Sequence, residues 1–310
     1  MTACKDGLLS IVVPVFNEEE NLEETHRRVS SVAVSSVNTS YEIVYVDDGS
    51  RDASWRIIAR LAADDPHVRG IRFARNFGHQ YALKAGMDEA RGDAIVTIDA
   101  DLQQPPELIE MLWKKWKEGY IIVDTRRRST HDISFFKRMT STLFYRLLNV
   151  ISDVKLEEGK ADFRLLDRRV VDYLRDTDDP QIFLRGIVAW FGFESATVEY
   201  EADARAGGES GYSLRKMVSL ATSGIMSFSL LPLRVSIFLG FLISFAGFLY
   251  AVYVILTKSL LDRQVEGWST LVVLLLIIGG VILSVLGVTG EYIGRIYQAL
   301  KSRPLYVVWE

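Results

Sequence analysis

Two carboxylates separated by a single residue, Asp99 and Asp101, follow a short apolar run and precede the turn-forming pair Pro105-Pro106. Alternate residues of an extended segment project to the same side, so the two charges repel each other unless a cation lies between them. Oxygen ligands, with Gln103 as a third candidate, favour Mg²⁺ or Mn²⁺ over zinc, and such ions bridge carboxylates to substrate phosphates. A solvated turn that caps the next helix explains the same residues, because Asp-x-Asp alone is common.

A second acidic segment, Asp47-Asp48-Gly49-Ser50-Arg51-Asp52, also follows an apolar, β-branched run. Carboxylates at such a strand end accept hydrogen bonds from ribose hydroxyls or from the edge of a base. A turn followed by an N-cap for a helix that starts at Ser54 is the structural alternative, and it suits Asp52 in particular. The segment therefore predicts either a nucleotide contact or a turn.

Short apolar runs alternate with helical patterns through about the first 125 residues. This alternation predicts an α/β fold in which helices cover a mostly parallel sheet, and such sheets bind ligands beyond the carboxyl ends of their strands. No GxGxxG or GxxxxGK[ST] motif follows a strand, so neither a dinucleotide fold nor a P-loop is supported. The expected strands are Leu9–Val15, Tyr41–Asp47, Val68–Phe73, Ala94–Asp99 and Tyr120–Thr125, and the expected helices are Glu18–Val34, Ser54–Ala63, Gln80–Ala90 and Pro106–Glu118.

Polar residues follow every one of these five strands, which indicates a single crevice at one edge of the sheet. They are Asn17 and Glu18, Asp47 and Asp48, Arg75 and Asn76, Asp99, Asp101 and Gln103, and Arg126–Arg128. The net charge of −4 argues against a general nucleic-acid binder. The single cysteine, Cys4, excludes an intramolecular disulfide and suits a reducing compartment.

Two uncharged stretches of about 22 residues each, Val235–Leu256 and Ser269–Gly290, predict membrane-spanning helices. A pair of buried core helices is the alternative, but core helices rarely stay uncharged for that length. Basic residues flank both stretches on their outer sides, namely Arg215, Lys216, Arg234, Arg295, Lys301 and Arg303. By the positive-inside rule, we expect a multi-pass hairpin in the inner (cytoplasmic) membrane, with the catalytic domain and both termini in the cytoplasm.

The domain division that follows is a cytoplasmic domain at 1–212, a juxtamembrane amphipathic helix at 213–230, and a hairpin with a cytoplasmic tail at 231–310. The spans are expected at about 233–257 and 269–292. Apolar residues at helical spacing, with basic residues among them, also predict an interface helix at about 133–150. An ordinary amphipathic helix packed on the domain is the alternative for that stretch.

Three segments resemble the family 2, GT-A-type glycosyltransferases: Val12–Glu18 (VVPVFNE), Val46–Ser50 (VDDGS) and Asp99–Gln103 (DADLQ). Three more narrow the resemblance to polyprenyl-phosphate glycosyltransferases, and they are Arg75–Gly78 (RNFG), Ala161–Arg168 (ADFRLLDR) and Arg205–Tyr212 (RAGGESGY). With the two C-terminal spans, the chain is most similar to bactoprenol glucosyltransferases and more distantly to dolichol-phosphate mannose synthases. The resemblance covers nearly the whole chain and implies a GT-A fold.

The resemblance also implies roles for individual residues. Donor binding is implied for Pro14, Phe16, Asn17, Glu18, Asp47, Asp48, Asn76, Asp99, Arg126 and Arg205. A metal, Mg²⁺ or Mn²⁺, is expected at Asp99, Asp101 and Gln103, and catalytic roles at Asp162, Arg164 and Asp101. The acceptor phosphate is expected at Lys137, Arg138, Ser210 and Tyr212. Asp162 matches the family's proposed catalytic aspartate, and three roles remain open for it: a base, a group that orients the acceptor, or a partner of Arg164.

The implied reaction is sugar transfer to undecaprenyl phosphate by a single, inverting displacement. UDP-glucose is the favoured donor, and GDP-mannose, UDP-N-acetylglucosamine and a UDP-aminoarabinose derivative remain open. The resemblance further implies a homotetramer and a separate flippase. A processive polysaccharide synthase is disfavoured because no Gln-x-x-Arg-Trp segment is present. A non-enzymatic nucleotide-sugar sensor or scaffold is the alternative from another class, although it has no need of Asp99, Asp101 and Asp162 together.

Overall fold

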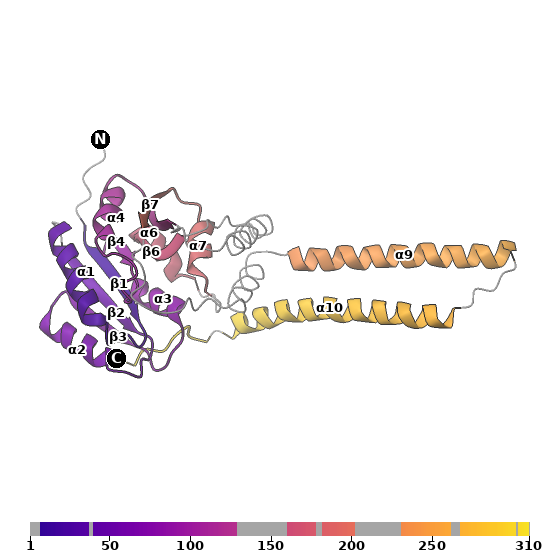
Figure 1. Ribbon diagram of the computed structural model, residues 1–310, viewed down its shortest axis with the longest axis horizontal. Coiled ribbons are helices and arrows are strands. Elements are labelled where there is room, and N and C mark those ends of the chain that lie inside the picture. Colours follow the sequence, from indigo (N-terminus) through magenta and orange to yellow (C-terminus); the bar gives the residue numbers. More distant parts are fainter. Residues whose placement is uncertain are drawn as a thin grey trace. The chain divides into compact units, whose positions relative to one another are not determined.

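The computed structural model describes residues 7–36, 40–128, 160–177, 182–201, 231–261, 267–301 and 303–309 (Figure 1). The chain forms two compact units, one of Met1–Val218 with Arg303–Glu310 and the other of Ser219–Ser302. The helices expected at 133–150 and 213–230 lie outside the described residues. The same holds for the candidate site residues Lys137, Arg138, Arg205, Ser210 and Tyr212.

The first unit is built on a seven-stranded sheet of order β3-β2-β1-β4-β6-β5-β7. Strands β1 (Leu9–Val15), β2 (Tyr41–Asp47), β3 (Val68–Arg72) and β4 (Ala94–Thr97) pair in parallel, which confirms the predicted mostly parallel sheet. All seven residues of β1 are buried, as expected of a central strand covered on both faces. The carboxyl ends of these four strands therefore meet at one edge.

Two further strands complete the sheet beside β5 (Ile122–Arg128), and they were not expected from the sequence. Strand β6 (Lys160–Asp167) runs antiparallel between β4 and β5, and β7 (Ser195–Glu201) pairs in parallel with β5. Charged residues at Asp162 and Arg164 interrupt the apolar run of β6, while Phe163 and Leu165 between them are buried in the core. This alternation brings Asp162 and Arg164 to the same face of the sheet.

Helices α1 (Leu22–Ser36), α2 (Ser54–Asp64), α3 (His79–Glu89) and α4 (Leu108–Lys117) alternate with the first strands where the sequence predicts them, and they cover both faces of the sheet (Figure 1). Helix α3 packs closely on β1 because it has a glycine there: a Cβ on Gly86 would lie 2.3 Å from Val12 Cγ1. Helices α6 (Arg168–Arg175) and α7 (Leu184–Trp190) follow β6. The Asp167 side chain caps α6 by accepting a hydrogen bond from the backbone N–H of Arg169.

The second unit is a hairpin of two long helices in contact, α9 (Leu231–Leu261) and α10 (Trp268–Leu300). Each contains a 24-residue apolar span, Leu231–Val254 and Ile277–Leu300, long enough and apolar enough to cross a membrane. Neither span is buried, which distinguishes both helices from the core helices of a globular protein.

The last residues of the chain return to the first unit instead of extending from the hairpin. Val308 forms an antiparallel bridge with Phe73, just after β3 ends. The backbone N–H of Ala74 donates to Val307, and that of Trp309 donates to Arg72, at 2.9 and 2.6 Å. The division expected from the sequence grouped this tail with the hairpin, whereas its backbone pairs with the edge of the sheet.

Candidate active site

The centre of the site lies where β4 and β6 run side by side. Their register pairs Thr97 with Arg164, and continuing it by two residues brings Asp99 opposite Asp162. The Thr97 hydroxyl donates to the backbone carbonyl of Asp162, which fixes the end of β6 at this point. Strand β4 is parallel to β1 and antiparallel to β6. The pairing with β6 brings together Asp99 and Asp162, which are 63 residues apart in the sequence.

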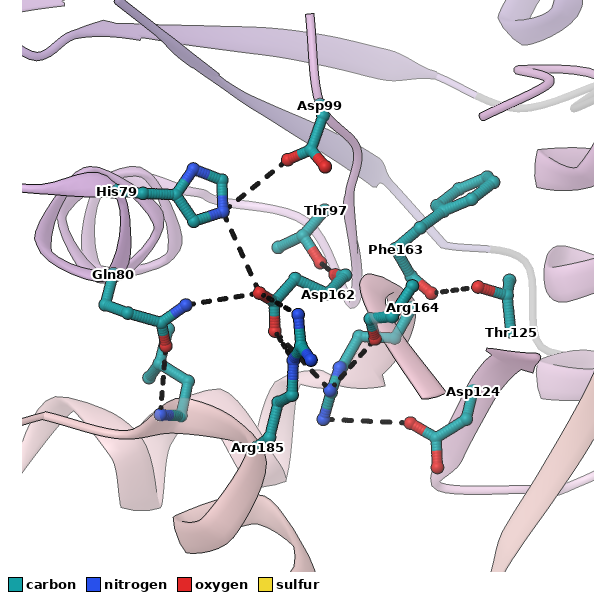
Figure 2. Close-up of polar contacts among 12 residues, drawn as sticks. His79, Gln80, Thr97, Asp99, Asp124, Thr125, Asp162, Phe163, Arg164 and Arg185 are labelled. Atoms are coloured by element: carbon teal, nitrogen blue, oxygen red, sulfur yellow. Dashed lines mark hydrogen bonds and ion pairs between the residues drawn. The ribbon is translucent and has the colours of Figure 1, made fainter. Parts of the chain in front are cut away.

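Asp162 is buried, and its carboxylate accepts hydrogen bonds from side chains of two helices, α7 and α3 (Figure 2). Arg185 on α7 donates from Nε to Oδ1 at 2.7 Å and from Nη2 to Oδ2 at 2.8 Å. Gln80 on α3 donates from Nε2 to Oδ2 at 3.2 Å, and its own Oε1 accepts from the backbone N–H of Leu184 at 3.1 Å. Gln80 therefore joins α3, β6 and α7 around one carboxylate.

These contacts set the ionisation of Asp162. Burial alone raises the pKa of its carboxyl, but the hydrogen bonds and charge of Arg185 and the charge of Arg164 outweigh burial and hold the pKa at about 2. At neutral pH the group is a fully ionised, weakly basic carboxylate with both oxygens occupied. Of the three roles left open by the sequence, that of a partner in an arginine network agrees best with this geometry.

Arg164, another residue expected to be catalytic, is also buried in this network. Its Nη1 lies 3.7 Å from Asp124 Oδ1 on β5, its Nη2 lies 3.7 Å from Asp162 Oδ1, and Nη2 donates to the carbonyl of Ala161 at 3.1 Å. Arg164 is thus shared between two carboxylates. Its geometry suits a residue that stabilises the two carboxylates by neutralising part of their charge.

Asp99 is the second carboxylate of the centre. Burial raises its pKa; His79, whose Nε2 lies 3.5 Å from Asp99 Oδ1, lowers it, and the charges of Asp162 and Asp101 raise it again. Gln104 Nε2 donates to Asp99 Oδ2 at 2.8 Å, and Gln104 Oε1 accepts from the Asp99 backbone N–H at 3.2 Å. The net result is a raised pKa, with burial as its largest cause.

Asp101 and Gln103 lie on the turn that follows. Asp101 Oδ1 accepts from the backbone N–H of Gln103 at 3.1 Å, and Leu102 between them has a positive φ of 56°. The Gln103 side chain is exposed, whereas Gln104 contacts Asp99. The side-chain amide that contacts Asp99 is therefore that of Gln104, whereas the sequence favoured Gln103.

The residues present suit a metal ion held jointly by protein and substrate. Among the described residues, no three His, Cys, Asp or Glu side chains gather into a complete site of their own. Asp99 and Asp101 supply two hard oxygen ligands, and the charge of Asp101 is one of those that raise the pKa of Asp99. Such an incomplete pair fits a cation that takes its other ligands from phosphates and water, as Mg²⁺ commonly does.

The ends of β1 and β2 form a second part of the site. Asp48 accepts from the backbone N–H groups of Phe77 and Gly78 at 2.7 and 2.9 Å. Asp47 Oδ1 accepts from the N–H of Ser50 at 3.1 Å, while its buried Oδ2 has no hydrogen-bond partner within the described ranges and lies 3.7 Å from Arg72 Nε. Burial raises the pKa of both carboxyls. Asp48 thus shapes a loop, and Asp47 Oδ2 is a buried acceptor whose nearest charged neighbour is Arg72.

The first-strand segment is interlocked with this turn. Asn17, at a positive φ of 56°, accepts from the backbone N–H of Arg51 at 2.9 Å, and Glu18 accepts from Asn21 Nδ2 at 2.8 Å. Burial raises the pKa of Glu18; the hydrogen bond from Asn21 lowers it, and the charge of Asp101 adds to the rise. Pro14 is buried within β1, whereas the Phe16 side chain is 44% exposed. Only Phe16 of this set presents a free apolar face.

The remaining candidates lie at the margins of the site. The Asn76 side chain is exposed on the loop between β3 and α3. Arg126 Nη1 lies 3.7 Å from Glu199 Oε1 on the neighbouring strand β7. Asp52 accepts from the backbone N–H groups of Glu19 and Ser54 at 3.2 and 3.0 Å, which confirms its structural role at the start of α2.

Sequence reasoning missed four residues of the centre: His79, Gln80, Gln104 and Arg185. His79 and Gln80 directly follow the RNFG segment, so their position was signalled by a motif already noted. Arg185 is the single charged residue of Ile182–Trp190, an otherwise apolar stretch. A lone arginine in a buried segment requires an acidic partner, and that requirement could have pointed to Asp162.

The comparisons with known proteins agree with this architecture. Residues 10–175 match the model of Glycosyl transferase family 2, and residues 231–296 match that of the GtrB C-terminal hairpin. The glycosyltransferase YkcC of Bacillus subtilis is 47% identical over 96% of this chain and 92% of its own length. The bactoprenol glucosyl transferase of Shigella phage SfII is 41% identical over 97% of each chain. The mannosyltransferase PcManGT of Pyrobaculum calidifontis, solved with GDP-Man and Mn²⁺, has a TM-score of 0.50 and 17% identity over 72% of this chain and 64% of its own.

The mixed sheet, its carboxylate centre and the helical hairpin define a GT-A glycosyltransferase with a membrane-type C-terminal unit. The chain belongs to glycosyl transferase family 2.

Proposed function

We propose that the protein transfers glucose from UDP-glucose to undecaprenyl phosphate at the cytoplasmic face of the membrane. The observation that carries this proposal is the clustering of Asp99, Asp101 and the clamped Asp162 at the carboxyl edge of the sheet. The name of the Shigella phage relative, aligned over 97% of both chains, supports the acceptor class and the sugar. The acceptor-phosphate residues Lys137, Arg138, Ser210 and Tyr212 remain predictions.

The nucleotide of the donor lies along the ends of β1 and β2 in this proposal. Asp47 Oδ2 accepts no hydrogen bond within the described residues and lies 3.7 Å from Arg72 Nε, so it has capacity to accept from a ribose hydroxyl or a base N–H. Phe16 offers an exposed ring beside the same turn, suited to contact with the base. Asn17, Glu18 and Asp48 keep this surface in shape through their hydrogen bonds to Arg51, Asn21, Phe77 and Gly78.

Cleavage of the sugar–phosphate bond builds negative charge on the departing nucleoside diphosphate. A divalent ion, Mg²⁺ or Mn²⁺, supplies positive charge to that group, and Asp99 and Asp101 are the residues that would hold it. The Asp99 side chain is 32% exposed, so it is partly shielded from solvent, and charge interactions there are stronger than in bulk water.

The acceptor requires little help from a base. A phosphate monoester has a second pKa of about 6, so its oxygen is already anionic at neutral pH. Asp162, with a pKa of about 2 and both oxygens bonded to arginine or glutamine, is poorly suited to take a proton. We therefore assign Asp162 to positioning Arg185 and Gln80, and the reaction to direct displacement by the acceptor oxygen with inversion at the sugar carbon.

The globular unit and both ends of the hairpin lie on the same side of the membrane in this proposal. Tyr306–Trp309 pair with β3 only five residues, 301–305, after α10 ends. Five residues reach at most about 18 Å, less than the roughly 30 Å of the hydrocarbon core. Basic flanks make that side the cytoplasm. A homotetramer belongs to the same proposal. A separate flippase also belongs to it, because two membrane spans of one chain enclose no path along which a glycolipid could cross the bilayer.

The direct test is to incubate the detergent-solubilised protein with undecaprenyl phosphate and radiolabelled UDP-glucose, GDP-mannose, UDP-N-acetylglucosamine or the UDP-aminoarabinose derivative. Each donor is run with Mg²⁺, Mn²⁺ or EDTA, and the label in the lipid phase is counted. We expect metal-dependent label from UDP-glucose, its loss in Asp99→Asn, and wild-type label in the exposed control Asp64→Asn. Nucleotide binding without label from any donor would favour the sensor or scaffold instead.

A further inference from the structure

The C-terminal tail, defined as Tyr306–Trp309, contacts both elements that flank the loop 74–78. On the β3 side, Val308 bridges Phe73, and the Tyr306 ring stacks on Phe73 with centroids 5.0 Å apart and planes 16° from parallel. On the α3 side, the Tyr306 hydroxyl donates to Asp88 Oδ2 at 3.2 Å. The tail therefore spans from the end of β3 to α3, and the loop joins the same two elements.

The loop itself carries the backbone groups that shape the nucleotide end of the site. Its Phe77 and Gly78 N–H groups are the donors to Asp48. The Phe77 ring contacts the Phe73 ring edge-on, with centroids 5.6 Å apart. Phe73 therefore lies in contact with both Tyr306 and Phe77. A continuous series of contacts thus runs from Tyr306 through Phe73 and Phe77 to Asp48.

The loop has a second neighbour that limits its freedom on the other side. Gly49, in the turn after β2, approaches so closely that a Cβ there would lie 2.4 Å from the Arg75 carbonyl carbon and 2.6 Å from the Asn76 nitrogen. The tail adds a direct bond at the loop's first residue, since the Ala74 N–H donates to the Val307 carbonyl at 2.9 Å. The loop is held by the β2 turn at one side and by the tail at its base.

The anchor of the tail on α3 is itself well fixed. Asp88 accepts from Lys84 Nζ at 2.6 Å, and the Lys84 side chain is only 3% exposed. Helix α3 begins with His79 and Gln80, two residues of the reaction centre. By bonding to Asp88 near the other end of this helix, Tyr306 helps to fix the position from which those two residues project.

We propose that the tail is a positioning element for donor binding, with Tyr306 as its principal residue. The inference rests on the proposed function, because it takes the ends of β1 and β2 as the donor site. Tyr306 touches no reacting group; it acts through Phe73, Asp88 and the loop 74–78. The tail follows α10 by five residues and belongs to the first unit, like the loop that it holds.

The test compares full-length wild type, Tyr306→Ala and the control Tyr173→Ala, which makes the same change at a tyrosine on α6 that is 59% exposed. Donor and acceptor KM, kcat and hydrogen exchange at Phe77 and Gly78 are measured for each. We expect Tyr306→Ala to raise the donor KM about fivefold, as loss of one aromatic contact and one hydrogen bond implies, with the acceptor KM unchanged. Exchange at Phe77 and Gly78 becomes faster, and Tyr173→Ala matches wild type.

An unchanged donor KM together with unchanged exchange in the loop would overturn the inference, and so would equal effects on donor and acceptor. If Tyr306→Ala does not fold, Tyr306→Phe decides: it keeps the ring and loses only the hydrogen bond to Asp88, so about a twofold rise confined to the donor KM is expected. Hydrogen exchange needs no substrate. A wild type that binds no donor would therefore refute the proposed function, while the exchange data still report whether the tail holds the loop.

Discussion

Arg185 donates two hydrogen bonds, of 2.7 and 2.8 Å, one to each oxygen of Asp162. A planar guanidinium that engages both oxygens orients the carboxylate as well as neutralising it. Gln80 adds a third bond to the same group, and His79 Nε2 lies 3.8 Å from Oδ2. Asp162 is thereby fixed in orientation and ionised, and both of its oxygens already accept hydrogen bonds. We therefore expect it to act in transfer by positioning Arg185 and Gln80.

The first prediction concerns the pH profile of Asp162→Asn. We expect kcat to fall about 10- to 100-fold because the substituted amide no longer neutralises Arg185 and Arg164. The acid limb of the rate should remain near pH 6 in both proteins, because it follows the second ionisation of the acceptor phosphate. Steady-state rates from pH 5 to 8 check this. Disappearance of the limb in Asp162→Asn would identify Asp162 as a base after all.

The second prediction concerns stability. Asp162 has a folded-state pKa of about 2, below its ordinary 3.8, so its contribution is present above pH 4 and is lost as the pH falls through about 2. Arg185→Ala leaves this buried charge without its main partner and should cost about 3 kcal/mol at neutral pH. Urea unfolding at pH 7 measures it. Arg185→Lys, which keeps the charge but not the fork, should lose less stability, and equal losses would contradict the bidentate argument.

Most of the sheet was predictable because β1, β2 and β4 are mostly apolar, buried runs with polar residues at or after their carboxyl ends. Strand β6 was not, because Asp162 and Arg164 break its apolar pattern, and their neutralisation by Arg185 and Asp124 is visible only in three dimensions. The pairing of Asp99 with Asp162 follows from an antiparallel strand inserted between β4 and β5, which periodicity does not reveal. The tail was assigned to the hairpin because four residues carry no signal of the strand edge they join.

The third prediction sets function against stability at Asp99. Because its folded-state pKa is raised by burial, the ionised group destabilises the metal-free fold at neutral pH, and lowering the pH through that raised pKa relieves the cost. Asp99→Asn should therefore unfold no more easily than wild type in EDTA, yet lose at least about 100-fold in turnover. Thermal unfolding is measured in EDTA and with Mn²⁺ plus UDP. We expect the ligands to stabilise only wild type; equal stabilisation of the variant would remove Asp99 from the metal site.

The fourth prediction uses two glycines with the same backbone conformation. Gly49 and Gly192 both have a φ of 70°, but a Cβ on Gly49 would strike the backbone of Arg75 and Asn76, while one on Gly192 would meet nothing within 4 Å. Both alanine variants carry the same local strain of about 1 kcal/mol. Only Gly49→Ala should displace the loop and weaken UDP binding, by about tenfold, in calorimetric titrations. Equal affinities in the two variants would show that the loop does not contact the nucleotide.

The last prediction concerns the membrane topology that belongs to the proposed function. With Cys4 replaced by serine, a single cysteine is placed at Arg303 or at Gly267, and an impermeant thiol reagent is added to membrane vesicles of either orientation. Residues 301–305 are too few to cross the bilayer, so under the proposed topology we expect Arg303→Cys to react in inverted vesicles. Gly267→Cys, between α9 and α10, must react only in right-side-out vesicles. Labelling of both positions from one side would mean that the two helices lie on the membrane without crossing it, and the acceptor phosphate would then have to reach the site along the surface of the hairpin.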